Sequence, residues 1–145
     1  MTDFLTVEDV LNLHADQVRM YGGESGVRDI ALLESAVAQP QATFEGKLLH
    51  GDLFEQAAAY MFHIVMNHPF LDGNKRTGAV ASLVFLDLNG IEIDAPSGTL
   101  YELAMSLAAG KIGKEDIADY FRRCAAIDRR EPGFVREPSA GLCIT

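Results

Sequence analysis

Cysteine is scarce in this chain, which has two, Cys124 and Cys143, among 145 residues. Two cysteines cannot build the multi-bridge framework of small secreted domains, and these two lack the spacing of a zinc site, so we expect both to remain thiols. The chain also lacks an apolar run long enough to span a bilayer and a basic leader followed by an apolar segment. The sequence therefore predicts a cytoplasmic protein with no membrane partner.

Positive charge is also in short supply. The chain has 12 Lys and Arg against 21 Asp and Glu, a formal net charge of -9, which repels a polyanion at long range. Direct binding to nucleic acid is therefore not expected. Hydrophobic residues make up 48% and charged residues 23%, as in an ordinary soluble domain. We expect one folded domain over residues 1–127 and a loosely ordered tail over 128–145, which Pro132 and Pro138 interrupt.

Most of the local sequence patterns in the chain are typical of helices, and the predicted fold class is all-α. Apolar residues recur every three or four positions, with caps before them and glycine or proline after them. The expected helices run over 6–21, 29–37, 52–67, 99–109 and 114–126. A further helix is expected to follow the segment 68–78 and to run to Leu88. Capping boxes are expected at Asp52 with Glu55 and at Thr99 with Glu102. Residues 41–51 read as an irregular connection and 91–94 as a short extended piece.

Between the two most apolar helices lies a segment dense in reactive side chains, His68-Pro69-Phe70-Leu71-Asp72-Gly73-Asn74-Lys75-Arg76-Thr77-Gly78. The first backbone N–H groups of a helix are unpaired and favour an anion such as phosphate. His68 beside that anion can accept a proton from a hydroxyl, and Asp72 can hold the divalent metal of a nucleotide. Gly73, Asn74, Lys75 and Arg76 then bind phosphate and neutralise developing charge. The predicted chemistry is phosphate transfer.

Each of these side chains also has a plainer interpretation. His68 could end the preceding helix, Asp72 could cap the next one, and Asn74 could form the turn. Phosphate contact is the preferred role for Asn74. Lys75 and Arg76 could be a solvated helix start, but cations there oppose the helix dipole and need a compensating anion. Phe70 is expected to anchor the loop in the core.

The same segment resembles the signature of the Fic and death-on-curing (Doc) family, which reads His, any, Phe, any, Asp or Glu, Gly or Ala, Asn, Gly or Lys, Arg. All seven specified positions, from His68 to Arg76, fit it. The stretches 21–29 and 88–90 also look like Doc proteins, so the likeness runs to about Ala126. It implies a compact helical bundle with the active loop between two central helices.

Two positions distinguish the branches of this family. Adenylyl-transferring members carry Gly where this chain has Lys75 and a second Arg where it has Ala79. The resemblance to the Lys-bearing Doc branch implies a protein kinase-type reaction, in which ATP presents its terminal phosphate for transfer to a Ser or Thr hydroxyl. His68, Asp72 and Arg76 would be catalytic, with Mg²⁺ on Asp72. Adenylylation remains an alternative, and so does an inactive module that binds a nucleotide or a peptide.

The resemblance also implies partners. Elongation factor Tu is the implied target, and arrest of translation is the implied result. A small Phd-like antitoxin would silence the toxin by inserting a disordered tail into its groove and folding there. Residues 41–51 occupy the place of the family's flap, which aligns the target backbone.

Other polar residues carry weaker signals. His63 lies five residues before His68, which is not the spacing of a zinc helix, so we expect it to be structural. His14 and His50 match no pattern. Arg28 and Asp29 are expected to form a salt bridge or a cap.

Overall fold

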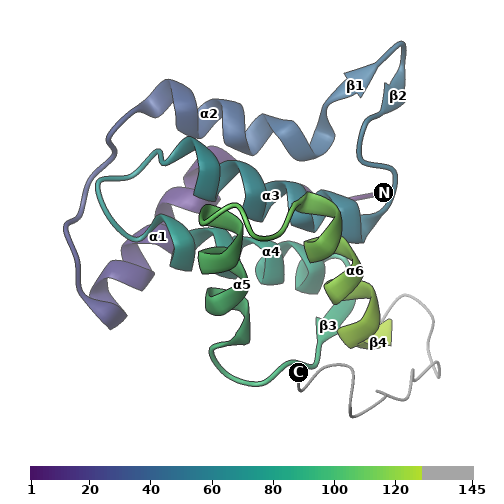
Figure 1. Cartoon of the computed structure of the whole chain (residues 1–145). Coiled ribbons are helices and arrows are strands. Elements are labelled where there is room, and N and C mark those ends of the chain that lie inside the picture. The colour runs from purple at the N-terminus through teal and green to yellow at the C-terminus, as the bar shows by residue number, and fades with distance from the viewer. Residues whose placement is uncertain (129–145) are drawn as a thin grey trace.

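The computed structural model describes residues 1–128, and this part of the chain is mostly helical (Figure 1). The helices are α1 (Val7–Tyr21), α2 (Ile30–Ala38), α3 (Leu53–Asn67), α4 (Asn74–Leu88), α5 (Thr99–Ala108) and α6 (Lys114–Cys124), with a 3-10 turn η1 (Gln39–Gln41). The strands are β1 (Thr43–Phe44), β2 (Lys47–Leu48), β3 (Ile91–Ile93) and β4 (Ala125–Asp128). They form two antiparallel pairs, β1 with β2 and β3 with β4. The predicted helical fold class is confirmed.

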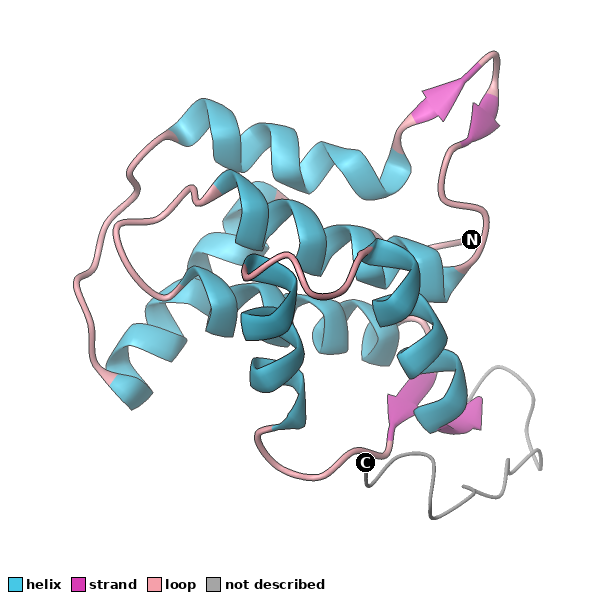
Figure 2. Ribbon diagram, viewed as in Figure 1, coloured by secondary structure: helices cyan, strands magenta, loops and turns pink. Residues whose placement is uncertain are grey.

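Helices α3 and α4 form the centre of the bundle, and the other helices surround them (Figure 2). Tyr60, Met61 and Ile64 of α3 are fully buried. Gly78 of α4 lies so close to α3 that a Cβ added there would stand 2.9 Å from the Val65 side chain. A glycine inside a helix costs about 1 kcal/mol relative to alanine, and here its lack of a side chain allows the two central helices to approach.

Helix starts follow the predicted caps in part. Asp52 accepts a hydrogen bond from the Glu55 backbone N–H at 2.8 Å, while the Glu55 side chain accepts from Gly51 instead of completing a capping box. The box predicted at the start of α5 is wrong. Gly98 is the N-cap there, with φ of 87°, and Thr99 is already helical. A left-handed turn of the chain, which glycine adopts without strain, starts this helix in place of a side-chain cap.

The connections differ most from expectation. Residues 41–51, predicted to be irregular, contain the β1–β2 hairpin, which projects away from the helices in Figure 1. The extended piece at 91–94 is confirmed as β3, whose partner β4 was not predicted. Helix α6 consequently ends at Cys124 rather than Ala126. Asp128, the first residue of the predicted tail, belongs to β4, and residues 129–145 lie outside the described part.

Two further expectations concern membrane spans and the cysteines. None of the helices within residues 1–128 combines the length and the apolar character needed to cross a membrane. Cys124 is buried at the end of α6, whereas Cys143 lies outside the described residues.

Candidate active site

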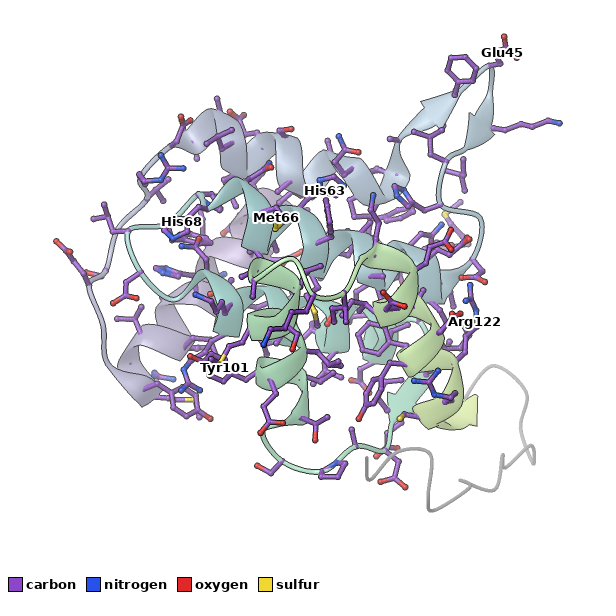
Figure 3. All side chains as sticks on the ribbon, in the orientation of Figure 1. Glu45, His63, Met66, His68, Tyr101 and Arg122 are labelled. Atoms are coloured by element: carbon purple, nitrogen blue, oxygen red, sulfur yellow. The ribbon has the colours of Figure 1, made fainter. Side chains whose placement is uncertain are left out.

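The reactive segment is a tight loop that connects α3 to α4. His68 follows the last residue of α3 in a left-handed conformation, with φ of 52°, and Pro69 prevents the helix from continuing. Gly73, with φ of 80°, is the N-cap of α4. Six residues therefore reverse the chain between the two central helices, and Figure 3 shows His68 at this end of α3.

Residues 26–29 clamp the loop from outside. The backbone N–H groups of Arg28 and Asp29 both donate to the carbonyl of Pro69, at 2.7 and 3.1 Å, and the Leu71 N–H donates to the carbonyl of Gly26 at 3.1 Å. The Arg28 guanidinium donates to the carbonyls of His68 and Asn67 at 2.7 and 3.0 Å. Arg28 therefore caps α3, which confirms a cap over a salt bridge.

Phe70 anchors the loop from inside, as predicted. It is fully buried, and its ring stacks on His14 of α1 with ring centroids 3.7 Å apart. The His14 Nε2 donates to the backbone carbonyl of Asp72 at 2.8 Å. Sequence reasoning missed this role for His14, although its position four residues after buried Val10 placed it on the apolar face of α1.

Asn74 closes the loop across its base. Its side-chain oxygen accepts from the Phe70 N–H at 2.9 Å, and its amide nitrogen donates to the Phe70 carbonyl at 3.0 Å. The side chain is 5% exposed. The side chain therefore holds the loop, and the backbone N–H of Asn74 belongs to the helix start. Contact between this amide and phosphate stays a prediction.

Asp72 is exposed and held at both of its carboxylate oxygens. One oxygen accepts from the Gly73 N–H at 2.9 Å, and the other accepts from the Glu24 N–H at 3.2 Å. Asp72 does not cap α4, so that interpretation is wrong. A Cβ on Gly23, whose φ is 111°, would stand 2.8 Å from the second oxygen. Glycine at position 23 thus lets the loop after α1 close over this carboxylate.

Arg76 lies between two aromatic rings. Its guanidinium carbon is 4.1 Å from the ring centre of Tyr21 at the end of α1 and 4.2 Å from that of Tyr101 on α5. Such stacking attracts the cation and restricts its rotamers. Tyr21 and Tyr101 were not identified from the sequence, because aromatic residues this far apart in the chain carry no local signal.

These side chains surround one cleft of about 300 Å³ at the start of α4. All six predicted site residues line it, His68, Asp72, Gly73, Asn74, Lys75 and Arg76, joined by Gln17, Val18, Tyr21, Gly22, Gly23 and Tyr101. The arrangement combines an exposed imidazole, a carboxylate, two cations and a helix start. An anion placed there meets favourable charge from both the side chains and the backbone.

The carboxylate fits a nucleotide-borne Mg²⁺. Within residues 1–128 no three His, Cys, Asp or Glu side chains gather into a metal site. Mg²⁺ commonly binds one or two carboxylates together with substrate phosphates and water, so a single exposed Asp72 beside the helix start is an adequate donor set. Each Asp72 oxygen accepts one N–H and retains a lone pair for a metal.

The helices and the cleft place this protein among mostly helical proteins that present an anion-binding loop between two central helices. The model of the Fic/DOC family matches residues 4–86. A protein named Toxin Doc from Mycolicibacterium smegmatis is 44% identical over 95 residues, 66% of this chain and 71% of its own. Protein kinase doc from Escherichia phage P1 is 33% identical over 120 residues, 82% of this chain and 93% of its own. This chain therefore belongs to the Fic/DOC family, and it is similar to proteins named as Doc.

Proposed function

We propose that this protein is a Doc-like toxin that transfers the terminal phosphate of ATP to a Ser or Thr hydroxyl of a cytoplasmic protein. The observation that carries the proposal is the single cleft that gathers His68, Asp72 and Lys75 at the start of α4. The relative named Protein kinase doc supports the kinase reading. Lys75 replaces the glycine that adenylyl-transferring members carry, and its side chain fills space beside the phosphate.

The placement of these groups supports the proposed reaction. The exposed His68 imidazole accepts the proton of the incoming hydroxyl, whose oxygen then bonds to the terminal phosphorus. The bond from that phosphorus to the bridging oxygen breaks, and ADP leaves with the electron pair. The backbone N–H groups at the start of α4, with Lys75 and Arg76, stabilise the charge that develops on the phosphate oxygens.

Asp72 would hold Mg²⁺ in this proposal. When bound, the ion neutralises phosphate charge and helps to fix the triphosphate. The chain's own contribution is to orient the Asp72 carboxylate, through the N–H groups of Gly73 and Glu24.

Elongation factor Tu is the proposed target, with arrest of translation as the consequence. The exposed β1–β2 hairpin, whose tip carries Glu45, projects at the end of the molecule opposite to His68 in Figure 3, so alignment of a target segment by this hairpin is not part of the proposal. A protein with this activity would damage its host, so a small Phd-like antitoxin is the proposed neutralising partner. Co-expression with the neighbouring reading frames should recover it as a co-purifying chain, and recovery of none would count against an antitoxin.

Two labelled forms of ATP test the reaction. The protein is incubated with elongation factor Tu and ATP labelled at either the terminal or the inner phosphate. Label should reach the target from the terminal position alone, with an added mass of one phosphate. Label from the inner phosphate alone would refute the kinase proposal in favour of adenylylation.

A further inference from the structure

Three basic side chains meet where α6 begins, outside the candidate active site. The Nζ of Lys114, the first residue of α6, is 3.1 Å from the Nε2 of His63 on α3 and 3.2 Å from the Nε2 of His50. His50 is buried in the connection between β2 and α3. The Nζ also lies 5.0 Å from the centre of the Phe62 ring. One amine is therefore held between two imidazoles and an aromatic ring.

The partners of this amine are unusual for a lysine. A charged side chain that is removed from water is generally paired with an opposite charge. Within residues 1–128, however, no Asp or Glu forms an ion pair with Lys114. Burial lowers the pKa of this ammonium. More of the amine is therefore unprotonated than in an exposed lysine, and the unprotonated amine is the nucleophilic form.

The two imidazoles are suited to accept a proton from the amine. Burial, followed by the positive charge of Lys114, lowers the pKa of both His50 and His63. Both rings are therefore neutral at neutral pH, and a neutral ring carries a lone pair on one of its nitrogens. An amine that forms a bond to a carbon atom must lose a proton, and here two acceptors lie within hydrogen-bond distance of it.

A pocket of about 240 Å³ gives access to this amine. It is lined by Leu49, His50, Glu55, Lys114, Glu115 and Ala118. Leu49 and Ala118 form the apolar part of the wall, and the pocket has room for a short acyl chain on Nζ. The two carboxylates repel a reagent whose charge lies next to its reacting carbon, such as an acyl phosphate, so the pocket favours an uncharged acyl group. A thioester presents such a group.

We propose that Lys114 is a site of Nε-acylation by small thioesters, with His50 or His63 accepting the proton that the amine loses. The lone pair of Nζ bonds to the carbonyl carbon, the bond from that carbon to sulfur breaks, and the thiolate leaves with the electron pair. The product is an amide on Lys114. None of these residues lines the phosphate cleft, so the acylation site stands apart from the proposed function.

Acylation changes the contact between α6 and the segments around it. The amide has one N–H where the ammonium has three, so it can donate to only one of His50 and His63. The positive charge that lowers the pKa of both imidazoles is removed as well. Acylation of Lys114 therefore weakens a polar link between α6 and α3.

Competition between neighbouring lysines tests the proposal on the unmodified protein. Lys111 is exposed and lies three residues before Lys114, so it is the internal standard. The protein is incubated at neutral pH with S-acetyl-N-acetylcysteamine, an uncharged thioester, and peptide mass spectrometry measures the rate at each lysine. Lys114 should be acetylated several times faster than Lys111, although it is less exposed. In concentrated urea the two rates should become equal, because the imidazoles no longer surround the amine.

A rate at Lys114 equal to or below that at Lys111 in the folded protein overturns the proposal. A preference for Lys114 that persists in urea also overturns it, since local sequence would then be the cause. Acetyl phosphate tests the choice of donor and should show a smaller preference for Lys114. Acetylation of Lys114 by acetyl phosphate alone would overturn the assignment of a thioester.

Replacing the imidazoles tests their part in the reaction. The double variant His50→Gln with His63→Gln should slow acetylation of Lys114 several-fold and leave the rate at Lys111 unchanged. Glu34→Gln, at an exposed position on α2, is the control and should leave both rates unchanged. Circular dichroism establishes that the double variant is folded. An unchanged rate at Lys114 in the folded double variant overturns the role of the imidazoles as proton acceptors.

Discussion

His63 within α3 and His68 just after its end have opposite surroundings. His68, after the last residue, is exposed and faces the cleft. His63 lies five residues earlier, and its Nε2 is 3.1 Å from the Nζ of Lys114 on α6. That ammonium is also 3.2 Å from the Nε2 of His50 and 5.0 Å from the centre of the Phe62 ring. Figure 3 shows His63 along α3, away from the loop that carries His68.

The difference shows which surroundings make a reactive side chain available. Burial, followed by the positive charges of Lys114 and His50, lowers the pKa of His63 to about 4. Burial also lowers the pKa of His50, with Lys114 as the second cause. The ring nitrogen of His63 is already engaged, so it supports the packing of α6 on α3, as expected for a structural histidine. Of these two histidines, only His68 combines access to solvent with a position in the cleft at the start of α4.

The largest expected effect separates these histidines by activity. His68→Ala should reduce phosphate transfer by about two to four orders of magnitude, because it removes the general base. Transfer from terminally labelled ATP measures the rate, and growth inhibition on expression gives the cellular readout. His63→Gln, on the same helix, is the control and should retain transfer. Growth inhibition that survives in His68→Ala would favour the inactive binding module.

The second prediction concerns the stability of the loop that presents His68. Asn74→Ala leaves the buried N–H and carbonyl of Phe70 without their partner, which should cost about 2–4 kcal/mol in the free energy of unfolding. Urea denaturation measures the loss. Asn74→Asp keeps the acceptor and should lose less. A loss as small as that of the exposed Glu34→Ala would show that the two hydrogen bonds from the Asn74 side chain to the Phe70 backbone do not hold the loop.

The third prediction uses acid to break the His63 cluster. A folded-state pKa near 4, below the unfolded value of 6.5, means that the unfolded chain binds the proton more readily between these values. Stability contributed by neutral His63 is therefore complete above pH 6.5 and decreases as the pH falls toward 4. Solvent screening at this half-buried site limits the decrease to about 1–2 kcal/mol.

Denaturation at pH 7 and at pH 4.5 measures this slope. His63→Gln cannot take up the proton and should flatten it, with some stability lost at pH 7. An unchanged slope in His63→Gln would assign the acid sensitivity to other groups.

The smallest expected effect concerns the KM for ATP and the aromatic rings of Tyr21 and Tyr101 around Arg76. Tyr101→Leu removes one ring and should raise the KM for ATP about two- to fivefold, since an exposed cation–π contact is worth about 0.5–1 kcal/mol. Steady-state kinetics with separate KM and kcat values measure it. Tyr101→Phe retains the ring and should behave as the unmodified protein. Equal effects of Leu and Phe would show that the hydroxyl, not the ring, matters.

Much of the site was predictable because its residues are consecutive. Positions 68–76 span one short loop and the helix start after it. Residues that are neighbours in this part of the sequence are therefore also neighbours in space. Phe70 as anchor and Asp29 as the cap of α2 follow from the same local chemistry, with Asp29 accepting from the Leu32 N–H at 3.1 Å. The hydrogen bonds from Asn74 to the Phe70 backbone were not predicted, because an amide suits a phosphate and a loop backbone equally well.

Contacts between distant segments could not be predicted. Strand β4 depends on β3, more than thirty residues earlier, and a four-residue strand without its partner has no distinct pattern. Tyr21 and Tyr101 both reach Arg76 only because α1 and α5 each pack against α4. The start of α5 was misplaced because Gly98 supplies a backbone turn where a Thr–Glu pair suggested a side-chain cap.

The sequence by itself determined the helical class, the position of the reactive loop and the identity of its imidazole, carboxylate and cations, because local periodicity and short spacings encode them. The tertiary structure decided which histidine is accessible, which side chains clamp the loop and which aromatic rings enclose Arg76. Those outcomes depend on burial and on contacts between residues far apart in the chain, and burial exists only once the helices have packed.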